Sequence, residues 1–189
     1  MTRLRQESFA CAVLVFLVGC SGKRDVASQT PESPLSGFLF QADELHASLH
    51  LTDPETTSEV PADLGWTSNP EVSEQSPFLE AVARGGSQGR LDSAGMRAAL
   101  YARYTDGMNE IGVYGLEAKS MKDADQREAL IREIWAHNES LDRTRVYRRG
   151  RVLFVVWLWT KEDAPLECWE STKRRFQQRL DKLQAGNDG

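Results

Sequence analysis

The sequence predicts an α+β fold: a four-stranded antiparallel sheet with two helices, in the order ββα-ββα. Two observations predict it. Apolar stretches with strand-like alternation occur in two pairs, each joined at a glycine-containing turn. A segment with apolar residues at helical spacing then follows each pair. We expect this domain over residues 76–187, after a signal peptide over residues 1–19 and a linker over residues 20–75.

The first pair of strands is expected at residues 97–104 and 110–118, with Asp106-Gly107 at the turn. Residues 97–104 are rich in alanine, leucine and arginine, which have high helix propensity, so a helix remains an alternative for this segment. A short helix over residues 76–83 precedes the pair, with Pro77 in its first turn and Gly85-Gly86 at its end.

The helix after this pair is expected over residues 121–138, with Ser120 as N-cap and Asp123 three positions on. The second hairpin is expected to turn at Gly150 and continue into residues 152–159, which are apolar on both alternating faces, as in a strand buried on both sides.

In the last helix we expect Asp163 as N-cap and Pro165 in the first turn. Its buried stripe should comprise Leu166, Trp169, Phe176, Leu180 and Leu183. If both long helices cover one face of the sheet, the other face needs a cover of its own. This could be the 76–83 helix, part of the linker or a partner protein.

Length and composition exclude several classes of protein. The chain has 189 residues, 27% of them charged, which excludes a polytopic membrane protein. Three cysteines are too few for a disulfide-stapled miniprotein, and a net charge of −5 argues against a nucleic-acid partner.

The N-terminus has the layout of a secretory signal. Arg3 and Arg5 precede ten apolar residues at 9–18, half the length that a membrane-spanning helix needs. The next residues, Leu17-Val18-Gly19-Cys20, resemble the lipobox of bacterial lipoproteins. That resemblance implies cleavage before Cys20, diacylglycerol on its sulfur and a third acyl chain on the new amino group. The implied partner is therefore a membrane, and Ser21 resembles the outer-membrane class of these proteins.

The linker differs sharply from the domain in composition. Residues 21–75 carry two basic and ten acidic side chains, whereas residues 76–189 carry 19 basic and 17 acidic ones. Six of the seven prolines lie between residues 21 and 77. This composition predicts a disordered spacer with a span of about 40 Å. Residues 35–51 are the exception: Phe38, Leu39, Leu45 and Leu49 could line a short helix that docks on the domain or on the membrane.

No arrangement of residues forms a catalytic, metal or cofactor signature, so we expect a non-enzymatic protein with no cofactor and no bound metal. His46 and His50 have the spacing of a helical zinc pair but no third ligand nearby, and His137 has no catalytic neighbour. Cys168 is expected to be buried, and the GGSQGR stretch lacks the ending of a phosphate-binding loop.

Basic residues are concentrated on the second hairpin and the last helix: Arg143, Arg145, Arg148, Arg149, Arg151, Lys173, Arg174 and Arg175. They are expected to protect a sheet edge, with phosphate, peptidoglycan carboxylates or the acidic linker as alternative ligands. The sequence therefore predicts a lipid-anchored binding or structural module of the cell envelope. The alternative is an accessory or inhibitory subunit of an envelope enzyme or transport assembly.

Overall fold

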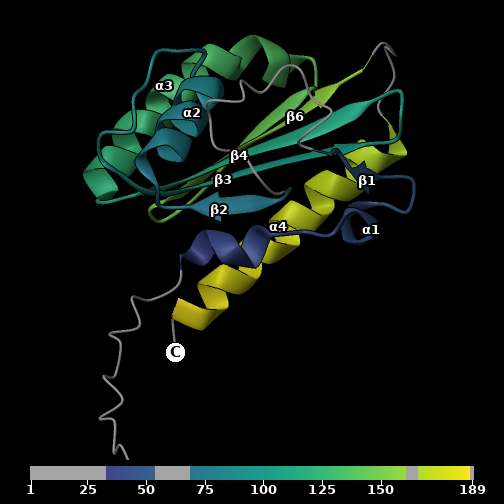
Figure 1. Cartoon of the computed structure of the whole chain (residues 1–189), viewed down its shortest axis with the longest axis horizontal. Coiled ribbons are helices and arrows are strands. Elements are labelled where there is room, and N and C mark those ends of the chain that lie inside the picture. The colour runs from purple at the N-terminus through teal and green to yellow at the C-terminus, as the bar shows by residue number, and fades with distance from the viewer. Residues whose placement is uncertain (1–32, 54–68, 161–165, 188–189) are drawn as a thin grey trace, which may run out of the picture. The chain divides into compact units, whose positions relative to one another are not determined.

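The computed structural model describes residues 33–53, 69–160 and 166–187 (Figure 1). This part of the chain is α+β, as predicted, and its six strands form one antiparallel sheet. The strands are β1 (His50–Leu51), β2 (Glu71–Ser73), β3 (Met96–Thr105), β4 (Glu110–Ala118), β5 (Thr144–Arg149) and β6 (Val152–Trp159). The helices are η1 (Pro34–Phe38), α1 (Ala42–Leu45), α2 (Ser76–Gly86), α3 (Met121–Ser140) and α4 (Glu167–Asn187).

The two predicted hairpins are confirmed. β4 pairs with β3 on one side and with β6 on the other, so the main strands lie in the order β3-β4-β6-β5. Asp106 shapes the first turn, since its carboxylate accepts hydrogen bonds from the backbone N–H groups of Met108 and Asn109. Gly107 and Gly150 have φ values of 92° and 56°, a backbone region that favours glycine.

The two long helices are confirmed with small changes at their ends. The side chain of Ser120 accepts a hydrogen bond from the backbone N–H of Asp123 at 3.1 Å, which is the expected N-cap. In α4, Trp169, Phe176 and Leu180 are buried. Asp163 and Pro165, the expected start of this helix, lie outside the described residues.

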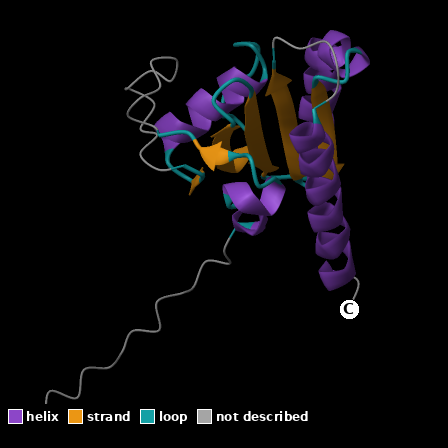
Figure 2. Cartoon of the chain, turned by 90° about the vertical axis from the view of Figure 1, so that its right-hand side faces the viewer, coloured by secondary structure: helices purple, strands orange, loops and turns teal. Residues whose placement is uncertain are grey.

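Helices cover both faces of the sheet, which corrects the expectation of two helices on one face. In Figure 1, α2 and α3 lie on one side of the sheet and α4 on the other, and Figure 2 shows α4 running along its side. The physical reason lies in the strands. Leu153 and Val155 of β6 point into a core with α2 and α3, whereas Phe154 and Val156 point into a core with α4. A sheet that is apolar on both faces needs a layer on each.

The folded unit begins well before residue 76, which corrects the expected boundary. Residues 33–53 belong to the same compact unit as the sheet and α4. Leu35, Phe38, Phe40 and Leu45 are at most 2% exposed and complete the core between the sheet and α4. The docking alternative for residues 35–51 is therefore confirmed, with the domain as its partner, but the segment forms η1, α1 and β1 rather than one short helix. The acidic, proline-rich surroundings of these apolar residues made the segment resemble a spacer.

The extra strands β1 and β2 also come from the expected linker. Both pair with the outer edge of β3, β1 at Tyr104–Thr105 and β2 at Ala99–Tyr101. Between β1 and β2, the side chain of Asn69 makes the hydrogen bonds to the edge of β3 that a strand would otherwise make. It accepts a hydrogen bond from the backbone N–H of Arg103 at 3.0 Å and donates to the carbonyls of Arg103 and Thr52 at 2.7 Å. With β1 and β2 the sheet has six strands rather than the expected four.

The expected signal peptide over residues 1–19, the lipobox and Cys20 lie outside the described residues. No helix among the described ranges combines the length and the hydropathy that crossing a bilayer requires.

Candidate functional site

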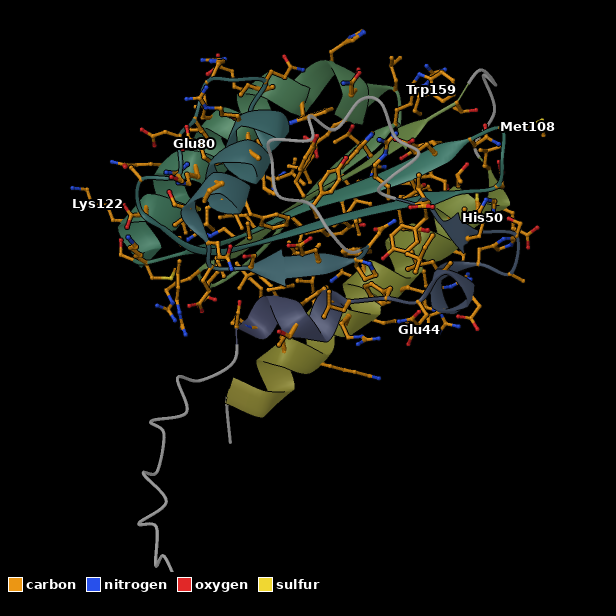
Figure 3. The ribbon with its side chains drawn as sticks, in the orientation of Figure 1. Glu44, His50, Glu80, Met108, Lys122 and Trp159 are labelled. Carbon is orange, nitrogen blue, oxygen red and sulfur yellow. The ribbon has the colours of Figure 1, made fainter. Side chains whose placement is uncertain are left out.

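A cleft of about 490 Å³ opens at the end of the sheet where β4 begins and β6 ends. Figure 3 labels Trp159 at this end of the molecule, near Met108 in the β3–β4 turn. The lining residues come from four strands, the residue after β6, the end of α3 and the segment between α3 and β5: Arg103, Glu110, Trp135, Asn138, Arg143, Thr144, Trp157, Leu158, Trp159 and Thr160.

The cleft lies where the helices stop covering the sheet. Along one face of β6, Leu153 is 1% exposed and Val155 is 2% exposed, whereas Trp159 is 55% exposed. Trp157, between them, is partly buried. The face of β6 that carries residues 153, 155, 157 and 159 is therefore covered by α2 and α3 at one end and opens into the cleft at the other.

The ring of Trp157 is held flat against the sheet. It stacks on Tyr114, with ring centroids 4.5 Å apart and an interplanar angle of 17°. Its cross-strand partner is Gly112, where an added Cβ would lie 1.8 Å from the indole. Gly112 therefore provides the space that the indole occupies. Burial raises the pKa of Tyr114 to about 12, as expected for a phenol enclosed by other side chains.

The C-terminal end of α2 also approaches Tyr114 closely. A Cβ at Gly85 would lie 2.8 Å from the Tyr114 ring, so only glycine allows this separation. Trp135 of α3 is fixed as well, because its indole N–H donates to the carbonyl of Gly86 at 2.7 Å. Two of the three tryptophans of the cleft are thus oriented by contacts outside it.

The polar part of the cleft is built on an ion pair. Arg103 of β3 and Glu110 of β4 lie on the same face as Trp157 and form a hydrogen-bonded ion pair. Their side chains are only 7% and 21% exposed. Thr144, 1% exposed, also lines the cleft, and its hydroxyl has no hydrogen-bond partner among the described residues. The cleft therefore combines indole faces with hydrogen-bonding groups of both charges.

The histidines singled out in the sequence are not brought together as a metal site. His46 follows the last residue of α1 and His50 begins β1, so the two do not share a helix face. Nδ1 of His46 lies 2.8 Å from the hydroxyl of Ser48, and its Nε2 lies 4.0 Å from Glu167. His137 lies in the last turn of α3. Within residues 33–53, 69–160 and 166–187, no three potential metal-ligating side chains cluster.

The basic residues of the second hairpin are largely engaged by acidic groups of the same chain. Arg148 forms ion pairs with Asp125 and Glu128, and Arg151 lies 3.6 Å from buried Glu117. On α4, Lys173 pairs with Asp142 and Glu170 at 2.7 Å. These contacts favour a structural role over an anion-binding surface.

The remaining candidates are structural. Cys168 is buried, as expected. In the GGSQGR stretch, Gly85 and Gly86 end α2, and the hydroxyl of Ser87 donates to the carbonyl of Ala83 while accepting from the backbone N–H of Leu91.

Sequence reasoning did not identify the cleft. One signal was available: Trp157 and Trp159 are two residues apart at the end of a strand, so both lie on one face. Arg103 and Glu110 flank the Asp106-Gly107 turn, and the strand register makes them diagonal neighbours on one face of the hairpin. The sequence could not show that α3 reaches this end only with its last residues and that no residue of α2 lines the cleft.

No protein-family model, curated protein or solved structure matches this chain.

Proposed function

We propose that this protein is a lipid-anchored, non-enzymatic binding module of the bacterial cell envelope, held by acyl chains on Cys20 and facing the periplasm from the outer membrane. The observation that carries the binding function is the tryptophan-lined cleft with its Arg103–Glu110 pair.

The position of the cleft suits an anchored protein. Ser33, the first described residue, donates a hydrogen bond to Glu117 at 2.6 Å, at the end of β4. The cleft lies at the start of the same strand, at Glu110. Seven residues of antiparallel strand separate the two ends by about 24 Å. The chain thus enters the domain at one end of the sheet and presents the cleft at the other.

The distance that the domain can extend from the membrane is limited, because the fold begins at about residue 33 rather than at residue 76. Ser33 lies thirteen positions after Cys20 in the chain. Even fully extended, this stretch spans at most about 45 Å. Two or three acyl chains on Cys20 would anchor the protein stably in the membrane, because each methylene buried in the lipid contributes about 0.8 kcal/mol.

A binding role suits the chemistry of the cleft better than catalysis. Glu110 and Arg103 are each held in an ion pair with the other, and none of the three histidines lines the cleft. Fixed indole rings and a fixed ion pair are suited to holding a ligand in one orientation.

The second candidate function is an accessory or inhibitory subunit of an envelope enzyme or transport assembly. Two large apolar side chains are exposed at the cleft end, Trp159 at 55% and Met108 at 72%. Exposed apolar residues at one end of a domain are typical of a protein contact.

The anchor is tested by fractionating cells that express Cys20→Ser, with Cys11→Ser as a matched control. The lipobox predicts that Cys20→Ser moves to the soluble fraction, whereas the control stays with membranes. Mass spectrometry should find acyl mass on a peptide that begins at Cys20. An N-terminal peptide that retains Met1 would contradict the anchor.

A crosslinking experiment distinguishes the two functions. A photo-crosslinking amino acid is placed at position 108, and the same amino acid at the exposed position of Lys122 serves as the control. Lys122 lies at the opposite end of the sheet (Figure 3). One stoichiometric protein adduct specific to position 108 would favour the accessory subunit. Absence of such an adduct would favour the binding module.

A further inference from the structure

We propose that the cleft binds a saccharide, with a sugar ring stacked on the exposed indole of Trp159 and hydroxyl groups bonded at the Arg103–Glu110 pair. This inference rests on the proposed binding function and names its ligand class. It does not depend on whether Cys20 is acylated.

The aromatic part of the cleft suits a ring with one apolar face. An indole is electron-rich above and below its plane, and the C–H bonds of a pyranose face carry a small positive charge. Trp159 offers such a plane, since it is 55% exposed at the end of β6. Trp157 and Trp135 form further aromatic walls, and both rings are already fixed by Tyr114 and by the carbonyl of Gly86. A ligand therefore meets aromatic surfaces that need little ordering.

The polar part of the cleft suits hydroxyl groups. Each hydroxyl both donates and accepts, a guanidinium only donates and a carboxylate only accepts. Arg103 and Glu110 lie side by side in the cleft, so neighbouring hydroxyls on one sugar can bond to both. Asn138, from the end of α3, adds an amide with both capacities.

The ion pair also disfavours simple ions as the ligand. An anion at the pair would meet Glu110 at short range, and a cation would meet Arg103. A quaternary ammonium, which tryptophans often bind, would have to approach this buried guanidinium. An uncharged ligand rich in hydroxyls avoids both repulsions.

The volume is adequate for such a ligand. About 490 Å³ lies within the range of small-molecule sites, which is about 300–1,000 Å³.

The test is a titration of the full chain, purified in a polyoxyethylene detergent that carries no sugar headgroup. The probes are cellotetraose, chitotetraose and maltotetraose, with tetramethylammonium and inorganic phosphate as ionic comparisons. Binding is followed by tryptophan fluorescence and by saturation-transfer NMR. We expect at least one tetrasaccharide to saturate the protein, and neither ion to do so.

Variants assign the binding to the cleft. Trp159→Ala should weaken binding at least tenfold, and Asn138→Ala should weaken it to a smaller extent. Met108→Ala, an exposed residue of the same end that does not line the cleft, should leave the affinity within twofold. Because Trp159 and Met108 are both exposed, their variants should melt at the same temperature as the parent protein.

Three results would overturn the assignment: no tetrasaccharide bound with a Kd below about 10 mM, an ion bound instead, or binding that survives Trp159→Ala. Failure of the saccharide assignment is distinguishable from failure of the proposed function. If no sugar binds but Cys20→Ser still releases the protein from membranes, the ligand class is wrong and the anchor stands, and crosslinking at position 108 then tests the binding module separately.

Discussion

Replacing Phe38 by alanine tests whether the segment from Ser33 to Leu51 is part of the fold or a spacer laid over it. Phe38 is 1% exposed, and its ring centroid lies 4.3 Å from that of Phe154 on β6 and 5.9 Å from that of Phe176 on α4. The side chain therefore fills the space between the sheet and α4. Removing it leaves a cavity lined by aromatic rings.

The expected loss is large. Phenylalanine-to-alanine changes in a core lower the free energy of unfolding by about 3–5 kcal/mol. A domain of this size has a total of about 5–15 kcal/mol. Each kcal/mol corresponds to about 2–4 °C, so the melting temperature should fall by about 6–20 °C. A passive spacer predicts no change at all.

The assay is urea unfolding followed by circular dichroism, with Gly37→Ala as the matched control. A Cβ at Gly37 would meet nothing within 4 Å, so this neighbouring substitution should leave the free energy of unfolding unchanged. The two variants differ in burial and share the same short helix. A loss below about 1 kcal/mol for Phe38→Ala, with an unchanged m-value, would refute the reasoning.

Four further predictions concern other parts of the fold. Burial raises the pKa of all four tyrosines of the chain, Tyr101, Tyr104, Tyr114 and Tyr147. The phenolate absorbance at 295 nm should therefore stay low up to about pH 11 and rise as the protein unfolds. Unfolded tyrosines ionise near pH 10, so stability is lost as pH rises above this value, and a full absorbance step at pH 10 in folded protein would contradict the burial. Burial acts to raise the pKa of Glu128, but hydrogen bonds from Arg148 and Arg132 outweigh it and the pKa is lowered. The stabilisation from Glu128 is therefore present above the unfolded pKa and lost as pH falls through the lower folded value, so Glu128→Gln should flatten the acid limb of a stability-against-pH curve. Asn69→Ala should lower the free energy of unfolding by about 1–3 kcal/mol, measured in urea, because three hydrogen bonds to the backbone are lost and the Arg103 carbonyl keeps only the bond from the backbone N–H of Thr52. Gly112→Ala should displace the Trp157 indole and reduce the near-UV circular dichroism, whereas an unchanged spectrum would show that the ring does not lie on this glycine.

The hairpins and the start of α3 could be predicted because their signals are local. Asp106-Gly107 and Gly150 are turn residues for reasons that involve only their own backbone, and Ser120 caps the helix that follows it directly. The alternation of residues 110–118 is likewise a property of one strand. These features do not depend on what packs against them.

The N-terminal segment was harder to predict because its role depends on distant partners. Phe40 offers its carbonyl to the hydroxyl of Tyr104, and Leu45 offers its carbonyl to the hydroxyl of Ser171. These pairs are 64 and 126 residues apart in the chain. Averaged over residues 21–75, the acidic and proline-rich composition outweighs the few apolar side chains that make the contacts.

The sequence alone determined the two hairpins, the helices α2, α3 and α4, and the burial of β6 on both faces, because periodicity, caps and turn residues act over a few positions. The tertiary structure decided which layer covers each face and where coverage ends. The cleft depends on the latter: α2 and α3 bury Leu153 and Val155 but leave Trp159 exposed beside Arg103 and Glu110. Relative positions of this kind follow from packing between segments far apart in the chain, which no local pattern encodes.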